Sequence, residues 1–134
     1  DGDRPPRQAA LLPWDEVAVN LIGYWKIHVG NMEYEFNALT CIDPVTNLVK
    51  IILLNKKTAA HVAQKFENVW LSRYPRPLKC IHDNGGEFIG WELQQMLQRN
   101  GVDDAPTTAH NPQANSVCEQ LHQTVTNTLR TMTQ

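Results

Sequence analysis

Residues 78–86 read Leu-Lys-Cys-Ile-His-Asp-Asn-Gly-Gly, a short strand that ends in an acid and is followed by a tight turn. Pro75 and Pro77, just before it, end the preceding helical pattern. In mixed sheets flanked by helices, ligands bind beyond the carboxyl ends of the strands. Asp83 lies at such an end and is therefore a candidate site residue.

Upstream of this strand, the pattern predicts a meander followed by a helix. Three segments have the length and composition of strands: residues 16–23, 35–42 and 48–54. Gly23 is expected to end the first of them, and residues 31–33 look like the turn to the second. A helix is then expected from an N-cap at Thr58 to Tyr74, because apolar residues recur every three or four positions.

Downstream, the pattern alternates between helix and strand. We expect a helix over 91–100 with Gly101 as its stop, a strand over 102–107, and a polar loop over 110–115. A last helix begins near Ser116. Its apolar stripe consists of Val117, Leu121, Val125, Leu129 and Met132. The whole order predicts an α/β domain whose five-stranded mixed sheet is flanked by helices.

Composition places the chain among globular domains but does not name a function. Of 134 residues, 42% are hydrophobic and 19% charged, which is outside the range of disordered chains. The three cysteines lack a CxxC spacing, which favours buried free thiols in a reducing, intracellular compartment. The formal charge of −2 does not favour DNA binding by bulk electrostatics. No apolar run is long enough to span a bilayer, so no membrane partner is expected.

Two acids have the spacing of a metal-dependent phosphoryl-transfer site. Asp83 ends a strand, and Glu119 lies one turn into the last helix, off its apolar stripe. They are 119 − 83 = 36 positions apart, with 35 residues between them. Divalent ions that catalyse phosphoryl transfer need hard oxygen ligands that converge from different elements. Taken alone, Asp83 could equally be a turn residue and Glu119 a solvated helix residue.

Four stretches carry a family resemblance. The sequence IHDNGGEF at 81–88, followed by the glutamate of NPQANSVCEQLHQTV at 111–125, resembles the D,D-35-E signature of retroviral and LTR-retrotransposon integrases. The stretches PWDEVAVNLIGYW at 13–25 and AHVAQKFENVWLSRYPRP at 60–77 look like the rest of a gypsy-like integrase catalytic core. The resemblance covers nearly the whole chain from Trp14. It implies an RNase H-like fold, with residues 1–13 as a linker and 14–134 as the catalytic core domain.

The resemblance implies a catalytic set of Asn20, Asp83 and Glu119, in which Asn20 stands where the family has its first aspartate. Asp83 and Glu119 would bind Mg²⁺ or Mn²⁺, and the amide at position 20 weakens that binding because it lacks a negative charge. Residues expected to contact DNA are Asn84, Gln113 and Asn115. Tyr24 and Gln120 also depart from the family pattern, which has proline and arginine there.

Other residues are weaker candidates for the site. Asp15 and Glu16 precede Asn20 by at least four strand residues, roughly 13 Å of extended chain. Asp43 stands before Pro44 and fits a turn better than a metal site. His122 has two interpretations, as a residue facing the site or as a hydrogen-bonded structural histidine. A zinc site is disfavoured because the spacing of its possible ligands matches no common zinc finger; these are His110, Cys118 and His122.

Three functional hypotheses follow. The first is an integrase core for DNA 3′-processing and strand transfer, inactive or strongly impaired by Asn20. The second is a domesticated, non-catalytic module for DNA or protein binding and dimerisation, and the third is an active enzyme that tolerates Asn20. The expected partners are element-end and target DNA and a second copy of the chain. The expected location is intracellular and nuclear.

Overall fold

The described residues form a five-stranded sheet. The structure, a computed structural model, describes residues 11–56, 58–83 and 90–107 and, in the C-terminal segment, residues 116, 119, 120, 123, 124, 126–128, 130 and 131. An antiparallel meander is made by β1 (Glu16–Val29), β2 (Met32–Ile42) and β3 (Val49–Leu54). Next to β1, the strands β4 (Lys79–His82) and β5 (Asp103–Pro106) add in parallel, which gives the order β3-β2-β1-β4-β5. The predicted mixed sheet is confirmed.

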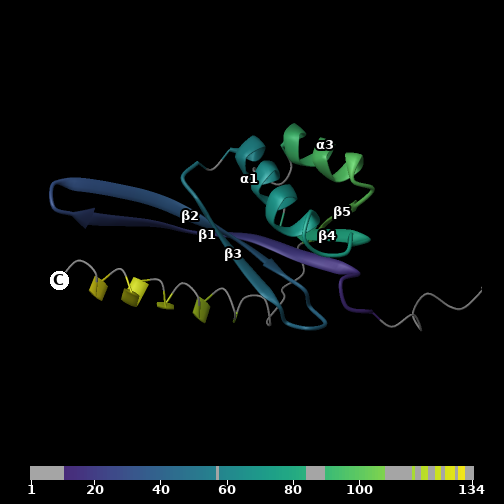
Figure 1. The fold of residues 1–134 in the computed structure, drawn as a ribbon, viewed down its shortest axis with the longest axis horizontal. Helices are drawn as coiled ribbons and strands as arrows, with labels where there is room; N and C mark the ends of the chain where they lie inside the picture. Colours follow the sequence, from purple (N-terminus) through teal and green to yellow (C-terminus); the bar gives the residue numbers. More distant parts are fainter. Residues whose placement is uncertain are drawn as a thin grey trace, which may run out of the picture.

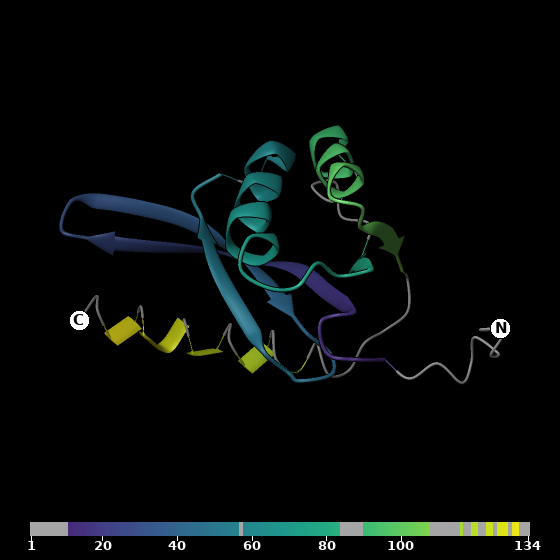
Figure 2. The same ribbon diagram turned by 45° about the vertical axis from the view of Figure 1, so that its right-hand side comes forward.

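Helices cover one face of the sheet. Figure 1 shows α1 (Ala59–Phe66), the π-helical turn η2 (Glu67–Leu71) and α3 (Trp91–Arg99) on one side of it. The described residues of the C-terminal segment lie on the other side in both ribbon views (Figures 1 and 2). Between the sheet and the helices lies the core, whose fully buried members include Val17, Leu39, Cys41, Leu54, Val62, Phe66, Trp70, Cys80, Leu93 and Leu97.

Local sequence explains where the helices begin and end. The hydroxyl of Thr58 accepts a hydrogen bond from the backbone N–H of His61 at 3.2 Å, which is the predicted N-cap. After Phe66 the helix continues as η2 and ends at Leu71, so the prediction of a helix to Tyr74 was three residues too long. Gly101 ends α3 with a φ of 70°, a left-handed conformation that glycine adopts without steric cost.

The first hairpin differs from the prediction. β1 does not end at Gly23 but continues to Val29, because a bulge between Gly23 and Trp25 leaves Tyr24 without a partner in the register. The turn is formed by residues 30–31 rather than 31–33. Gly30, with a φ of 62°, occupies the first central position, as a type II′ turn favours.

Glu67 joins η2 to the end of α3. Its carboxylate accepts hydrogen bonds from Nδ2 of Asn100 at 2.9 Å and from Nη2 of Arg99 at 3.1 Å. The amide of Asn100 contributes most to lowering the pKa of Glu67 below its ordinary value, and the guanidinium of Arg99 adds to the shift. In the folded state this group therefore binds protons less readily than in the unfolded chain.

This pKa shift predicts a pH-dependent contribution to stability. The contribution is complete above the unfolded pKa of Glu67, about 4.3, and is lost as the pH falls through the lower folded pKa. We expect Glu67→Gln to reduce the free energy of unfolding at pH 7 and to flatten its decline below about pH 5. Urea unfolding at pH 7 and at acidic pH would measure both effects. Asn100→Ser removes only the amide hydrogen bond to Glu67 and should show both effects in smaller size. Equal pH slopes for the native chain and Glu67→Gln would contradict the assignment.

Candidate active site

The register of β1 and β4 brings position 20 and position 83 together. These parallel strands pair Glu16 with Lys79 and end with Ala18 opposite Ile81. Two residues further along each chain stand Asn20 and Asp83, at 18 + 2 and 81 + 2. Neighbouring strands lie about 4.8 Å apart, so the two residues are at one level on adjacent chain segments. The first two of the three predicted site residues therefore both follow the end of this strand pairing by two positions, and their joint role stays a prediction.

Asn20 faces the side of the sheet away from α1 and α3. Its neighbours in β1, Val17 and Val19, are core residues on the helix-covered face, and strand alternation places Asn20 with Ala18 on the opposite face. Asn20 is half-buried and pairs with the buried Thr40 of β2, whose hydroxyl donates to the Asn20 carbonyl oxygen at 3.3 Å. Asp83, just after β4, is exposed. Asn20 is thus held within a paired strand, whereas Asp83 follows the end of its strand and is exposed to solvent.

Glu119 is an exposed residue of the helical C-terminal segment. The described residues of that segment lie on the same side of the sheet as Asn20 (Figure 2). Within the part of the chain that the structure describes, no three His, Cys, Asp or Glu side chains group closely enough to hold a metal ion. With asparagine at position 20, the predicted set contains only two carboxylates, so it could not have formed such a group of three.

Several predicted residues lie outside the described part of the chain. The three expected to contact DNA are among them: Asn84, Gln113 and Asn115. The three possible zinc ligands also lie there: His110, Cys118 and His122. Their roles stay predictions.

Asp43 is a turn residue, as predicted, and is not a substitute for the missing acid. Its fully buried carboxylate accepts hydrogen bonds from Oγ1 of Thr46 at 2.8 Å and from the backbone N–H of Val45 at 3.1 Å. It follows Ile42, which pairs with Ala18, so Asp43 lies near the start of β1, whereas the Asn20 level is further along that strand. Its oxygens are already engaged at a different level of the sheet.

A histidine–carboxylate pair beside Asp83 was not predicted. The imidazole of His82 is completely buried, and its Nε2 contacts Oδ1 of Asp104 at 2.5 Å. The His82 carbonyl also accepts the N–H of Thr107 at 2.8 Å, so side chain and backbone both tie the end of β4 to β5. The sequence held one indication: His82 is two residues after Cys80, on the core-facing set of a strand. That position is unusual for histidine unless its ring has a partner.

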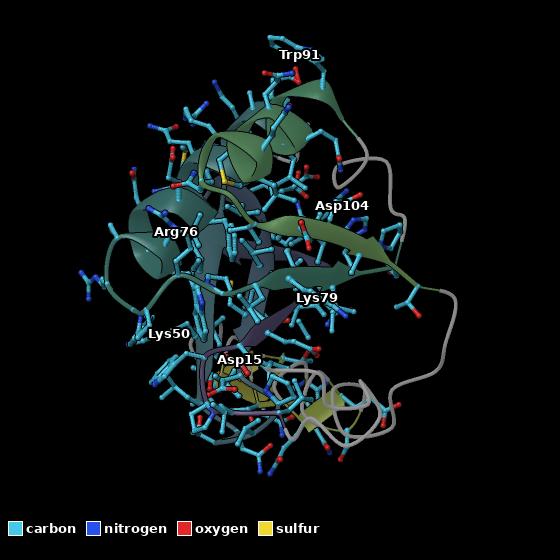
Figure 3. The ribbon with its side chains drawn as sticks, turned by 90° about the vertical axis from the view of Figure 1, so that its right-hand side faces the viewer. Asp15, Lys50, Arg76, Lys79, Trp91 and Asp104 are labelled. Atoms are coloured by element: carbon cyan, nitrogen blue, oxygen red, sulfur yellow. The ribbon has the colours of Figure 1, made fainter. Side chains whose placement is uncertain are left out.

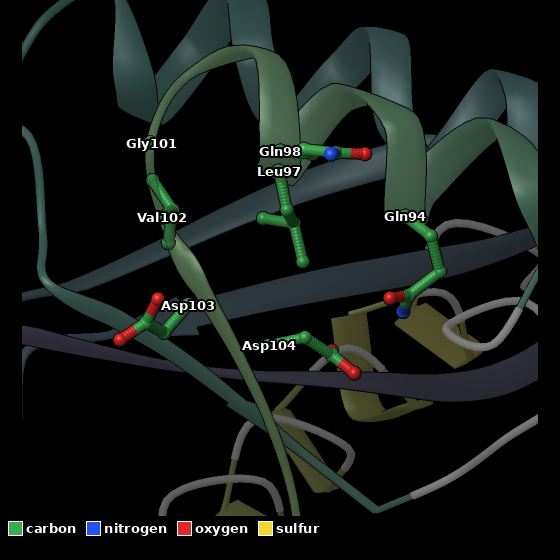
Figure 4. Close-up of a pocket in the computed structure, with 7 residues that line it drawn as sticks. All are labelled: Gln94, Leu97, Gln98, Gly101, Val102, Asp103 and Asp104. Atoms are coloured by element: carbon green, nitrogen blue, oxygen red, sulfur yellow. The ribbon is translucent and has the colours of Figure 1, made fainter.

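A depression beside α3 is separate from the Asn20 level. It has a volume of about 360 Å³ and is lined by Gln94, Leu97, Gln98, Gly101, Val102, Asp103 and Asp104 (Figure 4). Asp104 is paired with the core residue Cys80, which places this depression on the helix-covered side of the sheet.

Figure 3 also shows that the basic residues Lys50, Arg76 and Lys79 are spread apart from one another. These labelled side chains do not form a basic patch.

The chain is similar to a retroelement polyprotein and, in fold, to integrase catalytic cores. No protein-family model matches the chain. A retrovirus-related Pol polyprotein from the transposon TNT 1-94 of Nicotiana tabacum is 29% identical over 96 residues, which is 70% of this chain and 7% of that polyprotein. Among solved structures, the catalytic core domain of the HTLV-2 integrase in complex with magnesium superposes with a TM-score of 0.62 at 19% identity. The matched region covers 74% of this chain and 63% of the HTLV-2 integrase chain.

Two further structures agree. The catalytic core domain of BIV integrase has a TM-score of 0.60 at 19% identity and covers 82% of this chain and 65% of its own. An intasome of simian T-cell lymphotropic virus in complex with the PP2A regulatory subunit B56 gamma reaches a TM-score of 0.68 at 16% identity, over 87% of this chain and 40% of its own. This chain therefore spans less than two thirds of each of these relatives.

The fold is thus that of the RNase H-like integrase catalytic core. The resemblance to a retroelement integrase core, inferred above from sequence motifs, is confirmed, while its gypsy-like subdivision stays a prediction. None of the helices that the structure describes is long and apolar enough to cross a membrane.

Proposed function

We propose that the chain is the catalytic core of a retroelement integrase whose metal site is impaired by Asn20. The observation that carries this proposal is the β1–β4 register, which ends with Ala18 opposite Ile81, two residues before Asn20 and Asp83. In this proposal residues 14–134 are the core domain and 1–13 a linker. The parent reaction is the 3′-processing of element DNA and its strand transfer into a target.

The residues at this level fit a hard divalent cation only in part. Asp83 offers carboxylate oxygens and Asn20 a single neutral carbonyl oxygen, both of the hard type that Mg²⁺ and Mn²⁺ prefer. Glu119, exposed on the same side of the sheet, is the proposed third ligand. A homologous core is known in complex with magnesium. When bound, such ions supply charge stabilisation and activate the attacking oxygen of a water or a 3′-hydroxyl.

The residues of this chain would then have distinct roles. Asp83, on an exposed chain segment after β4, would hold a cation and receive a DNA phosphate beside it. Asn20 can orient a ligand through its carbonyl oxygen, but it adds no negative charge and cannot bridge two cations as a carboxylate does. The His82–Asp104 contact keeps the end of β4 in place and so limits the movement of Asp83. The proposed DNA contacts are Asn84, Gln113 and Asn115.

A non-catalytic binding and dimerisation module is the second candidate. It is favoured by a groove of about 360 Å³ between α1 and α3, at whose edge Trp91 is 71% exposed. Exposed tryptophans beside grooves are typical of protein-binding surfaces. One of the similar structures, the HTLV-2 integrase core, is described in a dimeric form. A homodimer is therefore part of both proposals.

Strand transfer with a pre-processed donor DNA end tests the proposed function. We expect the native chain to show little or no product in Mn²⁺ and the Asn20→Asp variant to gain activity. The double variant Asn20→Asp/Asp83→Asn should lose this activity again. The reason for all three results is that metal ions supply most of the charge stabilisation. Lys50→Asn, a change on the opposite, helix-covered face of the sheet, is the control for DNA binding at large. Full activity of the native chain would support an enzyme that tolerates Asn20. Activity that survives Asp83→Asn would refute the assignment of that ligand.

A further inference from the structure

The two edges of the sheet differ in length and chemistry. β5 forms one edge; it is only four residues long, contains Asp103 and Asp104 and ends at Pro106. Short length, charge and proline are common means by which a sheet edge avoids pairing with another chain. β3 forms the other edge with the sequence Val-Lys-Ile-Ile-Leu-Leu, in which the one charged residue is Lys50. By length and composition, β5 is protected against pairing and β3 is not.

Lys50 leaves the outer part of β3 apolar, because its side chain lies on the helix-covered side of the sheet. Its Nζ is 5.9 Å from the centroid of the Tyr74 ring, which is a cation–π distance. Ile51 and Leu53 alternate with the core residue Ile52 and so lie on the opposite side of the sheet. They are 43% and 60% exposed. The edge strand therefore presents two exposed apolar side chains to solvent.

The backbone of β3 has hydrogen-bonding groups that β2 does not use. The N–H of Asp43 donates to the carbonyl oxygen of Leu48 at 3.0 Å, one step beyond the end of the β2–β3 register. In an antiparallel ladder such hydrogen-bonded pairs alternate with pairs that exchange no hydrogen bonds. Every second position of β3, beginning with 50, therefore bonds to β2, whereas the N–H and C=O groups of Val49, Ile51 and Leu53 point outward. Among the strands that the structure describes, β3 pairs with β2 alone.

A second copy of the same strand fits this edge. If two β3 strands pair antiparallel about a two-fold axis through Ile52, Ile51 of each copy lies opposite Leu53 of the other. These are positions whose backbone groups point outward, so each Ile51–Leu53 pair can exchange two main-chain hydrogen bonds. The same pairs bring exposed apolar side chains together on one side of the sheet. Lys50 then lies opposite Leu54 of the other copy, so the pairing opposes no like charges.

We propose that the edge of β3 is an interface for a second copy of this chain, in which the two β3 strands pair antiparallel with Ile51 opposite Leu53. The pairing joins two five-stranded sheets edge to edge. This interface is separate from the groove between α1 and α3, and it does not rest on the proposed function. Two edge strands of six residues form a small contact compared with the ~1,200 Å² or more of stable interfaces, so we expect a weak, concentration-dependent dimer.

Disulfide trapping of the full chain tests the register of this pairing. A mixture of Ile51→Cys and Leu53→Cys chains should give a cross-linked dimer on mild oxidation, because directly opposite residues have Cα atoms about 5.5 Å apart, within disulfide range. Each variant alone should give at least about tenfold less, since its two new cysteines are on a diagonal, more than about 7 Å apart. The native chain gives the baseline for Cys41, Cys80 and Cys118. Equal cross-linking in the mixture and in the separate variants, or none in the mixture, would overturn the proposal.

A charge placed on the edge tests the interface without cysteine chemistry. Leu53→Lys and Leu78→Lys introduce the same side chain at positions that are 60% and 62% exposed, the second just before β4. In sedimentation equilibrium over a concentration series, we expect Leu53→Lys to raise the dissociation constant of the dimer by about tenfold or more, because lysine on an edge strand opposes pairing. Leu78→Lys should raise it by less than about twofold. A native chain that stays monomeric throughout, or association that Trp91→Ala abolishes and Leu53→Lys does not, would refute the β3 interface.

Discussion

Replacement of Asn20 by aspartate is expected to strengthen Mn²⁺ binding by more than about tenfold, a gain of about 1.4 kcal/mol or more in binding free energy. Position 20 lies at the level of Asp83, so the new carboxylate would add a full negative charge and a second oxygen next to an existing acid. Two carboxylates at close range repel each other without a cation, and this repulsion is relieved when a cation binds. Isothermal titration calorimetry with Mn²⁺ measures the effect directly.

A charge-matched control separates local coordination from general attraction. Asn68→Asp adds the same charge on the exposed side of η2, on the helix-covered side of the sheet. We expect it to change Mn²⁺ affinity by less than about twofold, since separated surface charges are screened within about a Debye length. Equal affinities for the native chain and Asn20→Asp would mean that Asn20 is not at a ligand position. The motif alignment of the first strand would then be wrong.

The order of the elements could be predicted because each has a local cause. Thr58 caps α1, Gly101 ends α3, and the prolines after Tyr74 separate the helical pattern from β4. Such features act within a few residues and are visible in one sequence. The placement of Asn20 and Asp83 just beyond the β1–β4 pairing needed more, because the sequence alone gives neither strand order nor register. Only the family resemblance placed these two residues in one site.

The features that were missed depend on tertiary structure. Gly23 was expected to end a strand, but a bulge lets glycine stay inside one, and the paired β2 carries β1 past it. His82 and Asp104 are 22 residues apart, so their contact arises only when β4 and β5 pair. Both misses follow from reading each segment without its neighbour in the sheet.

The second large effect is expected for stability: Trp70→Ala should lower the free energy of unfolding by about 3–5 kcal/mol. Trp70 is 1% exposed, and its ring lies 4.8 Å from that of Tyr74 and 6.1 Å from that of Trp14, measured between centroids. Trp14 in turn stacks on Tyr74 at 4.9 Å while holding a φ of 75°, a strained conformation for a bulky residue. Removal of Trp70 therefore creates a cavity and also weakens the contacts that keep Trp14 in place.

Trp91→Ala is the matched control, because Trp91 is 71% exposed at the start of α3 and is not one of the three rings in this cluster. We expect it to change the free energy of unfolding by less than about 0.5 kcal/mol. Urea unfolding followed by far-ultraviolet circular dichroism measures both variants without relying on tryptophan fluorescence. If Trp70→Ala does not fold, Trp70→Phe keeps an aromatic ring and should give a smaller loss. A cost for Trp91→Ala as large as that for Trp70→Ala would mean that Trp91 is buried in solution, and a second copy of the chain is then the partner that covers it.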